Sequence, residues 1–261
     1  MPDFSWMLLL LLGLMVGSFG TLIGAGGGFL LVPLLLYLYP HDSPAVLTSI
    51  SLAVVALNAL SGTAAYARAG RVNYRVGTAL SAASVPGTMA GAALTGFLTR
   101  GLFEVAFGIL LLLLAVFLFW KPLGQGDASP DARRTLIASP LRTGTAVTAS
   151  AVIGWLSGIM GIGGSPLQVA VLTHPLRVPV HTAMPTAQFM VLLSALGGVA
   201  VHAAQGHFAT DLTRLAILGA GVLVGAQMGA ALSTRVTSQG LVRLLALAVL
   251  TVSLRLILRA V

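Results

Sequence analysis

The stretch "GTLIGAGGGFLLVPLLL", residues Gly20–Leu36, places three consecutive glycines inside an otherwise apolar run. Glycine destabilises a helix interior by about 1 kcal/mol relative to alanine, so this motif predicts a helix that breaks and then starts again. A second apolar run is interrupted in the same way at "GIMGIGGSPLQVAVL", Gly158–Leu172. The organisation of the whole chain follows from what surrounds these two interruptions.

Composition places the apolar runs in a membrane. Hydrophobic residues make up 57% of the 261 residues, and charged residues only 8%. A soluble domain carries roughly 25% charged residues, so this chain has too few to cover a water-facing surface. Several apolar stretches also reach the length of about 20 residues that a bilayer span requires. We therefore expect an all-α polytopic membrane protein.

The charge pattern and the missing residue types exclude several functional classes. The net charge is +8, but the arginines lie at the ends of apolar segments and form no basic patch for nucleic acid. The chain has no cysteine, which excludes disulfides, thiolate metal sites and a cysteine nucleophile. It also has no HExxH, no GxSxG and no mid-membrane aspartate pair. We therefore expect no enzyme activity, no catalytic residue and no cofactor or metal.

Polar breaks divide the chain into about eight hydrophobic blocks. These blocks cover about residues 5–38, 44–66, 74–97, 101–120, 144–173, 182–203, 211–232 and 240–258. The one long polar connection, Lys121–Gly144, splits the chain into two halves. We interpret the chain as a single transmembrane domain, residues 1–261, made of repeat 1 at about 5–120, a cytoplasmic linker at about 121–143 and repeat 2 at about 144–261.

The two halves match each other in order. Gly24–Gly27 corresponds to Gly161–Gly164, and "GTMAGAAL" at Gly87–Leu94 corresponds to "GVLVGAQM" at Gly221–Met228. Matches at a nearly constant spacing indicate an internal duplication, which is common in secondary transporters. We expect two homologous four-segment repeats, each with a first segment that is broken at its glycine-rich motif.

Two topologies fit this duplication. If every block crosses the membrane once, the repeats are parallel. If the first block of each half turns back at its glycines, each half crosses three times and the repeats are inverted. The distribution of Lys and Arg places the central linker in the cytoplasm under both topologies, so it does not choose between them.

Each glycine break has the features of an anion site. Where a helix restarts, the N–H groups of its first turn are unpaired, and the positive end of the helix dipole favours an anion. Ser165 can cap the second restart and Pro166 suits its first position, whereas Gly26–Gly28 leave the first restart uncovered. Single glycines at four-residue spacing, such as Gly221 and Gly225, are instead typical of close helix packing.

We expect the breaks and the nearby polar residues to form one substrate-binding site. The candidates are the glycines of both motifs, the capping serine and polar residues of the second, fifth and sixth blocks: Gly24, Gly26, Gly27, Gly28, Gly161, Gly163, Gly164, Ser165, Thr48, Ser51, Asn58, Gln168, Thr186 and Gln188. Hydrogen bonding between helices is the alternative role of the polar candidates, and for Asn58 and Gln188 both roles stay open. His202 is a candidate for proton coupling because an imidazole can titrate near neutral pH; an interfacial histidine is the alternative.

The chain resembles the TauE/SafE sulfite exporter family in three features. These are the "GAGGG" element at Gly24–Gly28, the "GIGG" element half a chain later and the threonine-containing starts of the following helices. The resemblance extends from about Gly17 to Leu258. It implies a bacterial inner-membrane permease for small sulfur-containing or organic anions, such as sulfite and sulfonates. The candidate partners are this anion, a coupling proton or sodium ion, the lipid bilayer and a second copy in a homodimer. An uncoupled anion channel and a transporter of a non-sulfur small carboxylate are the alternatives.

Overall fold

A computed structural model describes residues 4–24, 26–120, 140–208 and 212–233. Over these residues the chain is built from α-helices and one 3-10 turn, so the predicted all-α class is confirmed. Most of the predicted linker and the whole predicted block at 240–258 lie outside the described residues.

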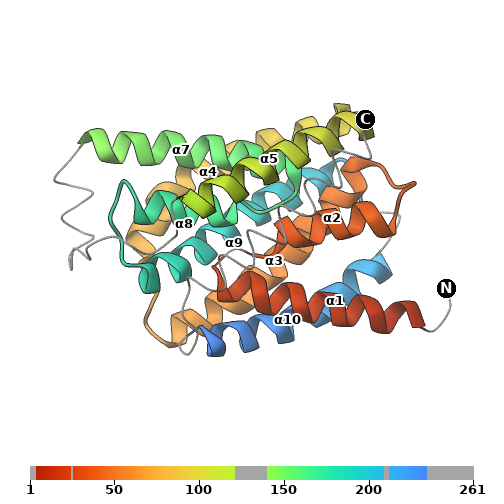
Figure 1. Cartoon of the computed structure of the whole chain (residues 1–261), viewed down its shortest axis with the longest axis horizontal. Helices are drawn as coiled ribbons and strands as arrows, with labels where there is room; N and C mark the ends of the chain where they lie inside the picture. The colour runs from red at the N-terminus through yellow and green to blue at the C-terminus, as the bar shows by residue number, and fades with distance from the viewer. Residues whose placement is uncertain (1–3, 25, 121–139, 209–211, 234–261) are drawn as a thin grey trace.

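The helices follow the predicted apolar blocks (Figure 1). The first half contains α1 (Phe4–Leu22), α2 (Gly28–Leu38), α3 (Pro44–Arg68), α4 (Tyr74–Leu94), a 3-10 turn (Thr95–Phe97) and α5 (Arg100–Trp120). The second half contains α7 (Pro140–Met160), α8 (Ser165–Thr173), α9 (Val180–Ala204) and α10 (Leu212–Leu232). Four described segments are long and apolar enough to cross a membrane: α3, residues Arg142–Met160 of α7, α9 and α10.

The short helices α2 and α8 begin differently from the long helices α3 and α4. Ser43 and Asn73 cap α3 and α4 with side-chain oxygens that accept a backbone N–H from the first turn. The N-cap residues of α2 and α8 are Gly27 and Gly164, both with a φ of 83° and no side-chain cap. Glycine adopts this left-handed conformation without the steric penalty that a Cβ brings. The chain can therefore turn sharply into α2 and α8, and their first N–H groups stay uncovered.

Glycines bring the helices of the two halves into close contact. On α4 and α7 the contacting glycines are Gly87, Gly91, Gly154 and Gly158. A Cβ at any of these positions would overlap the backbone of the facing helix. The pair formed by α1 and α10 is built in the same way, from Gly13, Gly17, Gly221, Gly225 and Gly229. The packing role that small residues at four-residue spacing predict is confirmed for these two pairs.

These contacts also fix the directions of the helices. Gly13 of α1 lies against Leu218 of α10, and Gly17 lies against Val222, so α1 and α10 run parallel. The order of the glycine contacts between α4 and α7 likewise shows that these two helices run parallel. The two long central helices run in opposite directions, because Gly62 of α3 contacts Gln188 near the start of α9 while Gly198, near its end, contacts Leu52 of α3. Figure 1 shows α1 and α7 running in opposite directions along the long axis.

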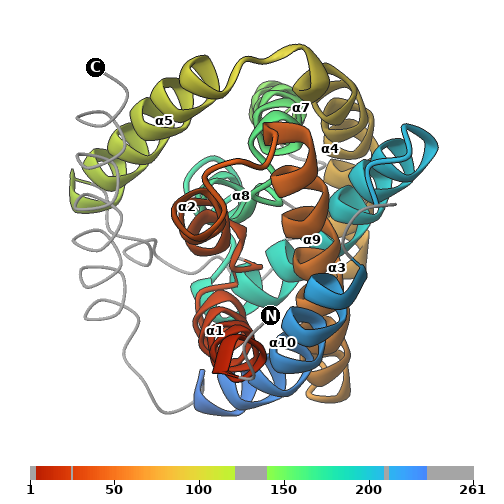
Figure 2. The same cartoon turned by 90° about the vertical axis from the view of Figure 1, so that its right-hand side faces the viewer.

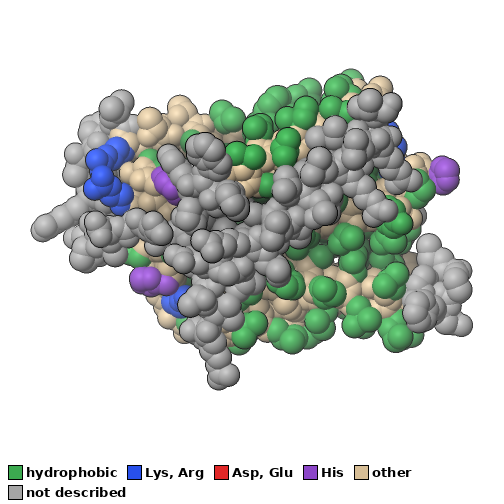
Figure 3. Space-filling view, in the orientation of Figure 1, with side chains coloured by type: hydrophobic (Ala, Val, Ile, Leu, Met, Phe, Trp, Pro, Cys, Tyr) green, Lys and Arg blue, Asp and Glu red, His purple; other side chains and the backbone are tan. Residues whose placement is uncertain are grey.

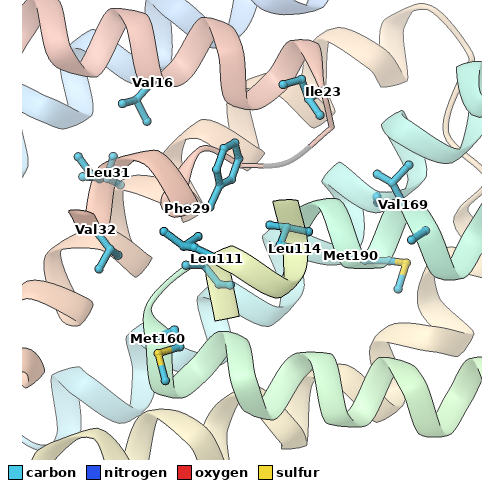
Figure 4. Packing of buried hydrophobic residues seen from close by; sticks show 14 of the residues in the cluster. Val16, Ile23, Phe29, Leu31, Val32, Leu111, Leu114, Met160, Val169 and Met190 are labelled. Carbon is cyan, nitrogen blue, oxygen red and sulfur yellow. The ribbon is translucent and has the colours of Figure 1, made fainter. Parts of the chain in front are cut away.

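The hydrophobic core surrounds the two short helices. Seen end-on, α2 and α8 lie between α1, α5, α7 and the central pair α3 and α9 (Figure 2). Leu31, Val32 and Leu35 of α2 are fully buried. Phe29 of α2 and Leu111 of α5 belong to the same buried hydrophobic cluster (Figure 4). The short helices therefore begin and run in the interior of the fold.

The outer surface is apolar along the helices and charged at the two ends. Hydrophobic side chains cover much of the described part of the long face, and the arginines lie at its ends (Figure 3). At the end where α3 finishes and α7 and α9 begin, the described arginines are Arg68, Arg71, Arg75, Arg142 and Arg177. At the opposite end, Arg100 and Arg214 are both ion-paired, with Glu104 and Asp42 respectively.

Candidate functional site

Two interruptions of the helices lie at the centre of the fold. The first break, residues 23–27, separates α1 from α2, and the second break, residues 161–164, separates α7 from α8. Positive φ angles between 67° and 83° occur at Gly24, Gly26, Gly27, Gly161, Gly163 and Gly164. For residues other than glycine this conformation costs roughly 1–2 kcal/mol, so the glycines are what lets the chain turn back at each break.

Both breaks lie against the same pair of valines, where α3 crosses α9. A Cβ on Gly26 would lie 2.9 Å from Val191 Cγ1 and 3.0 Å from Val55 Cγ1. A Cβ on Gly163 would meet the same two methyl groups at 3.2 and 2.5 Å. Neither glycine has room for a side chain, and the backbone of both breaks approaches the centre of the fold.

Each break packs on the long helix of the other half. Gly24 lies directly against Met184 of α9, and Gly161 lies against Thr48 of α3. Ser51 Oγ of α3 donates a 2.7 Å hydrogen bond to the carbonyl of Gly161. Backbone groups that a break frees inside a membrane need partners of this kind.

A buried polar network, the Gln188 cluster, surrounds the first break. It consists of Thr21, Gly26, Asn58, Tyr66 and Gln188. The N–H of Gly26 donates to Gln188 Oε1 at 3.3 Å, and Gln188 Nε2 donates to Thr21 Oγ1 at 3.3 Å and to the Asn58 carbonyl at 3.5 Å. Thr21 Oγ1 donates to Asn58 Oδ1 at 3.0 Å, and the Tyr66 hydroxyl donates to the Thr21 carbonyl at 2.8 Å. The four side chains are at most 1% exposed, and the cluster contains no charged group.

One donor of the cluster has no partner among the described residues. Asn58 Nδ2 is buried and makes no hydrogen bond there. A Cβ on Gly20 would lie 2.9 Å from Asn58 Nδ2 and 2.5 Å from the backbone N of Gly27, so both nitrogens are packed closely against Gly20. An unsatisfied buried donor costs about 1–3 kcal/mol, which an oxygen of a bound anion would offset. The first break therefore presents uncharged donors at the start of a helix.

The second break also has buried polar side chains beside it. Ser157 Oγ is buried without a partner among the described residues, 3.4 Å from where a Cβ on Gly164 would lie. Gln168 is buried on α8, where its Oε1 accepts a 3.3 Å hydrogen bond from Ser150 of α7. This glutamine ties α7 to α8.

The remaining predicted site residues have other contacts. Thr48 Oγ1 donates to the Pro44 carbonyl at 2.8 Å, so only its carbon atoms face the second break. Thr186 Oγ1 accepts from the Asn73 N–H at 3.0 Å, which ties α9 to the connection before α4. The side chain of Ser165 lies outside the described part of the chain.

His202 lies away from the breaks, in the last turn of α9. At 1.5 Å per residue, the helix axis places it about 20 Å from Gln188. Its ring is fully buried, and its Nδ1 lies 3.0 Å from Nδ1 of His207, so one ring donates and the other accepts.

Two members of the Gln188 cluster are not among the sequence-based candidates. Thr21 lies in the last turn of α1, directly before the first break, and links Asn58 to Gln188. Tyr66 lies in the last turn of α3 and bonds the Thr21 carbonyl. The sequence feature that could have identified Thr21 as a site residue is its position, because it is a polar residue inside an apolar run directly before the glycines.

Comparisons with known proteins give one family and several membrane transporter relatives. The family model for sulfite exporter TauE/SafE matches residues 9–256. The probable membrane transporter protein YunE of Bacillus subtilis is 30% identical to the chain, over 97% of both chains. A probable membrane transporter protein of Methanocaldococcus jannaschii is 26% identical over 74% of this chain and 70% of its own. A third, from Xylella fastidiosa, is 25% identical over 87% of this chain and 84% of its own. No solved structure shows a significant match.

Proposed function

The chain belongs to the sulfite exporter TauE/SafE family, whose relatives here are probable membrane transporters, and we propose that it is a secondary transporter of a small anion. Membership of this family and the apolar helices make it a multi-pass membrane protein. The observation that carries the proposal is the position of α2 and α8. Both begin at glycine caps inside the fold, against the same valine pair, and uncovered helix starts favour anions.

The crossed packing of the halves supports inverted repeats. The first helix of each half packs in parallel on the third long helix of the other half, α1 on α10 and α7 on α4. Each break also lies on the central helix of the other half, Gly24 on α9 and Gly161 on α3. This reciprocity fits two repeats that are related by an axis in the membrane plane, with first segments that turn back at their glycines. Rocking of one repeat against the other would then give alternating access to the breaks.

The arginines support an orientation for the protein. The positive-inside rule places the end with Arg68, Arg71, Arg75, Arg142 and Arg177 in the cytoplasm, together with the central linker. The opposite end carries the described acidic side chains, each paired with an arginine. In a bacterial inner membrane this end would face the periplasm.

The donors at the first break favour a small oxyanion such as sulfite or an organosulfonate. Gly26 N–H, the Asn58 amide and the start of α2 can each bond an anionic oxygen. The side chains of the Gln188 cluster are uncharged, with the Arg71 guanidinium 5.4 Å from the centre of the Tyr66 ring. Uncharged donors would keep the binding weak enough for release during transport. A proton carried by His202, or a sodium ion, would supply the coupling.

Uptake of radiolabelled sulfite into proteoliposomes tests the proposal. We expect saturable uptake that a pH gradient drives uphill and that sulfite analogues inhibit in a ranked order. Competition by sulfate, sulfoacetate and acetate identifies the substrate class, and strongest inhibition by acetate would indicate a carboxylate transporter. Flux that is downhill only and does not saturate would indicate an uncoupled channel. No flux of any of these anions would refute the proposal.

A further inference from the structure

We propose that the Gln188 side chain occupies the anion site in the absence of substrate and that the substrate displaces it. This inference rests on the proposed anion transport. Gln188 belongs to α9 in the second half, yet its carboxamide bonds Gly26, Thr21 and Asn58 of the first half. The side chain therefore joins the two halves at the first break.

Both polar atoms of the Gln188 carboxamide form hydrogen bonds at the first break. Its oxygen accepts the Gly26 N–H, which is the position that an anionic oxygen at the start of α2 would take. Its nitrogen donates to Thr21 Oγ1 and to the Asn58 carbonyl. Without this carboxamide the N–H of Gly26 would be a buried donor with no acceptor, a state that folded proteins avoid.

The bond to Gly26 is one that an anion can replace. Its length of 3.3 Å exceeds the usual 2.9–3.0 Å of an N–H···O bond, and its acceptor is neutral. Hydrogen bonds to an ionised acceptor are roughly twice as strong as those between neutral groups. The anion would also bond the Asn58 Nδ2 donor, which Gln188 leaves without a partner among the described residues.

Displacement of Gln188 has a consequence for transport. A Cβ on Gly62 would lie 2.8 Å from Gln188 Nε2 and 2.9 Å from Thr21, so α3 holds the carboxamide closely from behind. When the anion takes the Gly26 N–H, the carboxamide loses its hydrogen bond to the first break, and α9 then stays in contact with the break through the packing of Met184 on Gly24 and Val191 on Gly26. The binding energy of the anion is thereby coupled to the loss of a hydrogen bond between the halves, as a substrate-driven change of state requires.

Binding of sulfite to the purified full-length protein in detergent, measured by isothermal titration calorimetry, tests this inference. Gln188→Leu removes the competing acceptor at nearly the same volume. We expect it to bind sulfite more tightly, by about fivefold, the value of one net neutral hydrogen bond. Gln188→Met serves the same test if the leucine variant does not purify as a monodisperse protein. Gln188→Glu places a carboxylate on Gly26, and we expect it to abolish sulfite binding at neutral pH.

The matched control is Gln227→Leu. Gln227 of α10 also bonds across the halves, to the carbonyl and hydroxyl of Ser61 at 2.9 and 2.8 Å, but it contacts neither break. We expect its sulfite affinity to equal that of the wild type. Unchanged or weaker binding by Gln188→Leu and Gln188→Met would overturn the displacement inference while anion transport stands. A wild type that binds none of sulfite, sulfate, sulfoacetate and acetate would overturn the proposed function and this inference together.

Discussion

Ser51 and Gly161 belong to different halves of the chain and are joined by a 2.7 Å hydrogen bond from the Ser51 hydroxyl to the Gly161 carbonyl. Gly161 is the first residue after α7, where the regular helical hydrogen bonding ends. Gly161 is buried, so the serine replaces the partner that the broken helix no longer supplies. The second break is in this way stabilised by the first half.

Replacing Ser51 with alanine removes this partner. We expect Ser51→Ala to lower the free energy of unfolding by about 1–3 kcal/mol, because the Gly161 carbonyl is then buried and unpaired. Thermal unfolding in detergent measures the effect. The control is Ser49→Ala on the same helix, since Ser49 is equally buried but donates to the Val46 carbonyl of its own helix. Equal losses for the two variants would contradict the role assigned to Ser51.

Gly163 cannot accept a side chain, for two separable reasons. Its φ is 75°, and a Cβ would meet Val55 Cγ1 at 2.5 Å. Gly206 has a similar φ of 77° but open space around it, so Gly206→Ala isolates the backbone strain of roughly 1–2 kcal/mol. We expect Gly163→Ala to destabilise the protein clearly more than Gly206→Ala and to abolish sulfite uptake. The idea fails if the two variants unfold at the same temperature.

Alanine substitutions at two glycines of α7 should change the melting temperature in opposite directions. A Cβ on Gly154 would overlap the Ser84 carbonyl of α4, whereas a Cβ on Gly144 would meet nothing within 4 Å. We expect Gly154→Ala to separate α4 from α7 and to lower the melting temperature. Gly144→Ala gains helix propensity of about 1 kcal/mol and should raise it slightly. Melting curves of the two variants, recorded in the same detergent, test whether the two melting temperatures change in opposite directions.

The ion pair between Arg214 and Asp42 fastens the connection after α2 to α10. Arg214 is 7% exposed, lies over the Tyr39 ring at 3.4 Å and bonds Asp42 Oδ2 at 2.6 Å. Because Asp42 is partly exposed, we expect Asp42→Asn to cost about 2 kcal/mol, less than the full loss of a buried pair. Glu104→Gln is the comparison, since Arg100 also donates to the carbonyls of Leu36, Tyr39 and Asp42 and should remain in place. Thermal unfolding should rank Asp42→Asn as the more damaging change.

A substitution of His202 tests proton coupling separately from anion binding. If His202 carries the coupled proton, His202→Gln should keep downhill sulfite flux and lose the acceleration by a pH gradient. The control is His181→Gln, because His181 is exposed at the start of α9. A His202→Gln variant that still accumulates sulfite against its gradient in response to pH would remove the histidine from the mechanism.

The apolar blocks predict the helices well because length and hydropathy are local properties. The starts of α3 and α4 lie at the block boundaries predicted near residues 44 and 74, where the structure shows Ser43 and Asn73 as caps. The Gln188 cluster could be predicted only in part, because its bonds join residues as distant as Thr21 and Gln188. The four-residue spacing of glycines also identified helix faces made of small residues, such as the face with Gly225. It could not indicate that this face contacts Leu14 of α1. Pairing of this kind depends on the tertiary arrangement.

The pairing of α1 with α10 has a consequence for biogenesis. The glycine face of α1, at Gly13 and Gly17, is synthesised before its complement on α10, and the other described helices are synthesised in between. Until α10 is inserted, the exposed backbone of this face lacks that complement. Final packing of α1 therefore depends on the insertion of α10 into the bilayer.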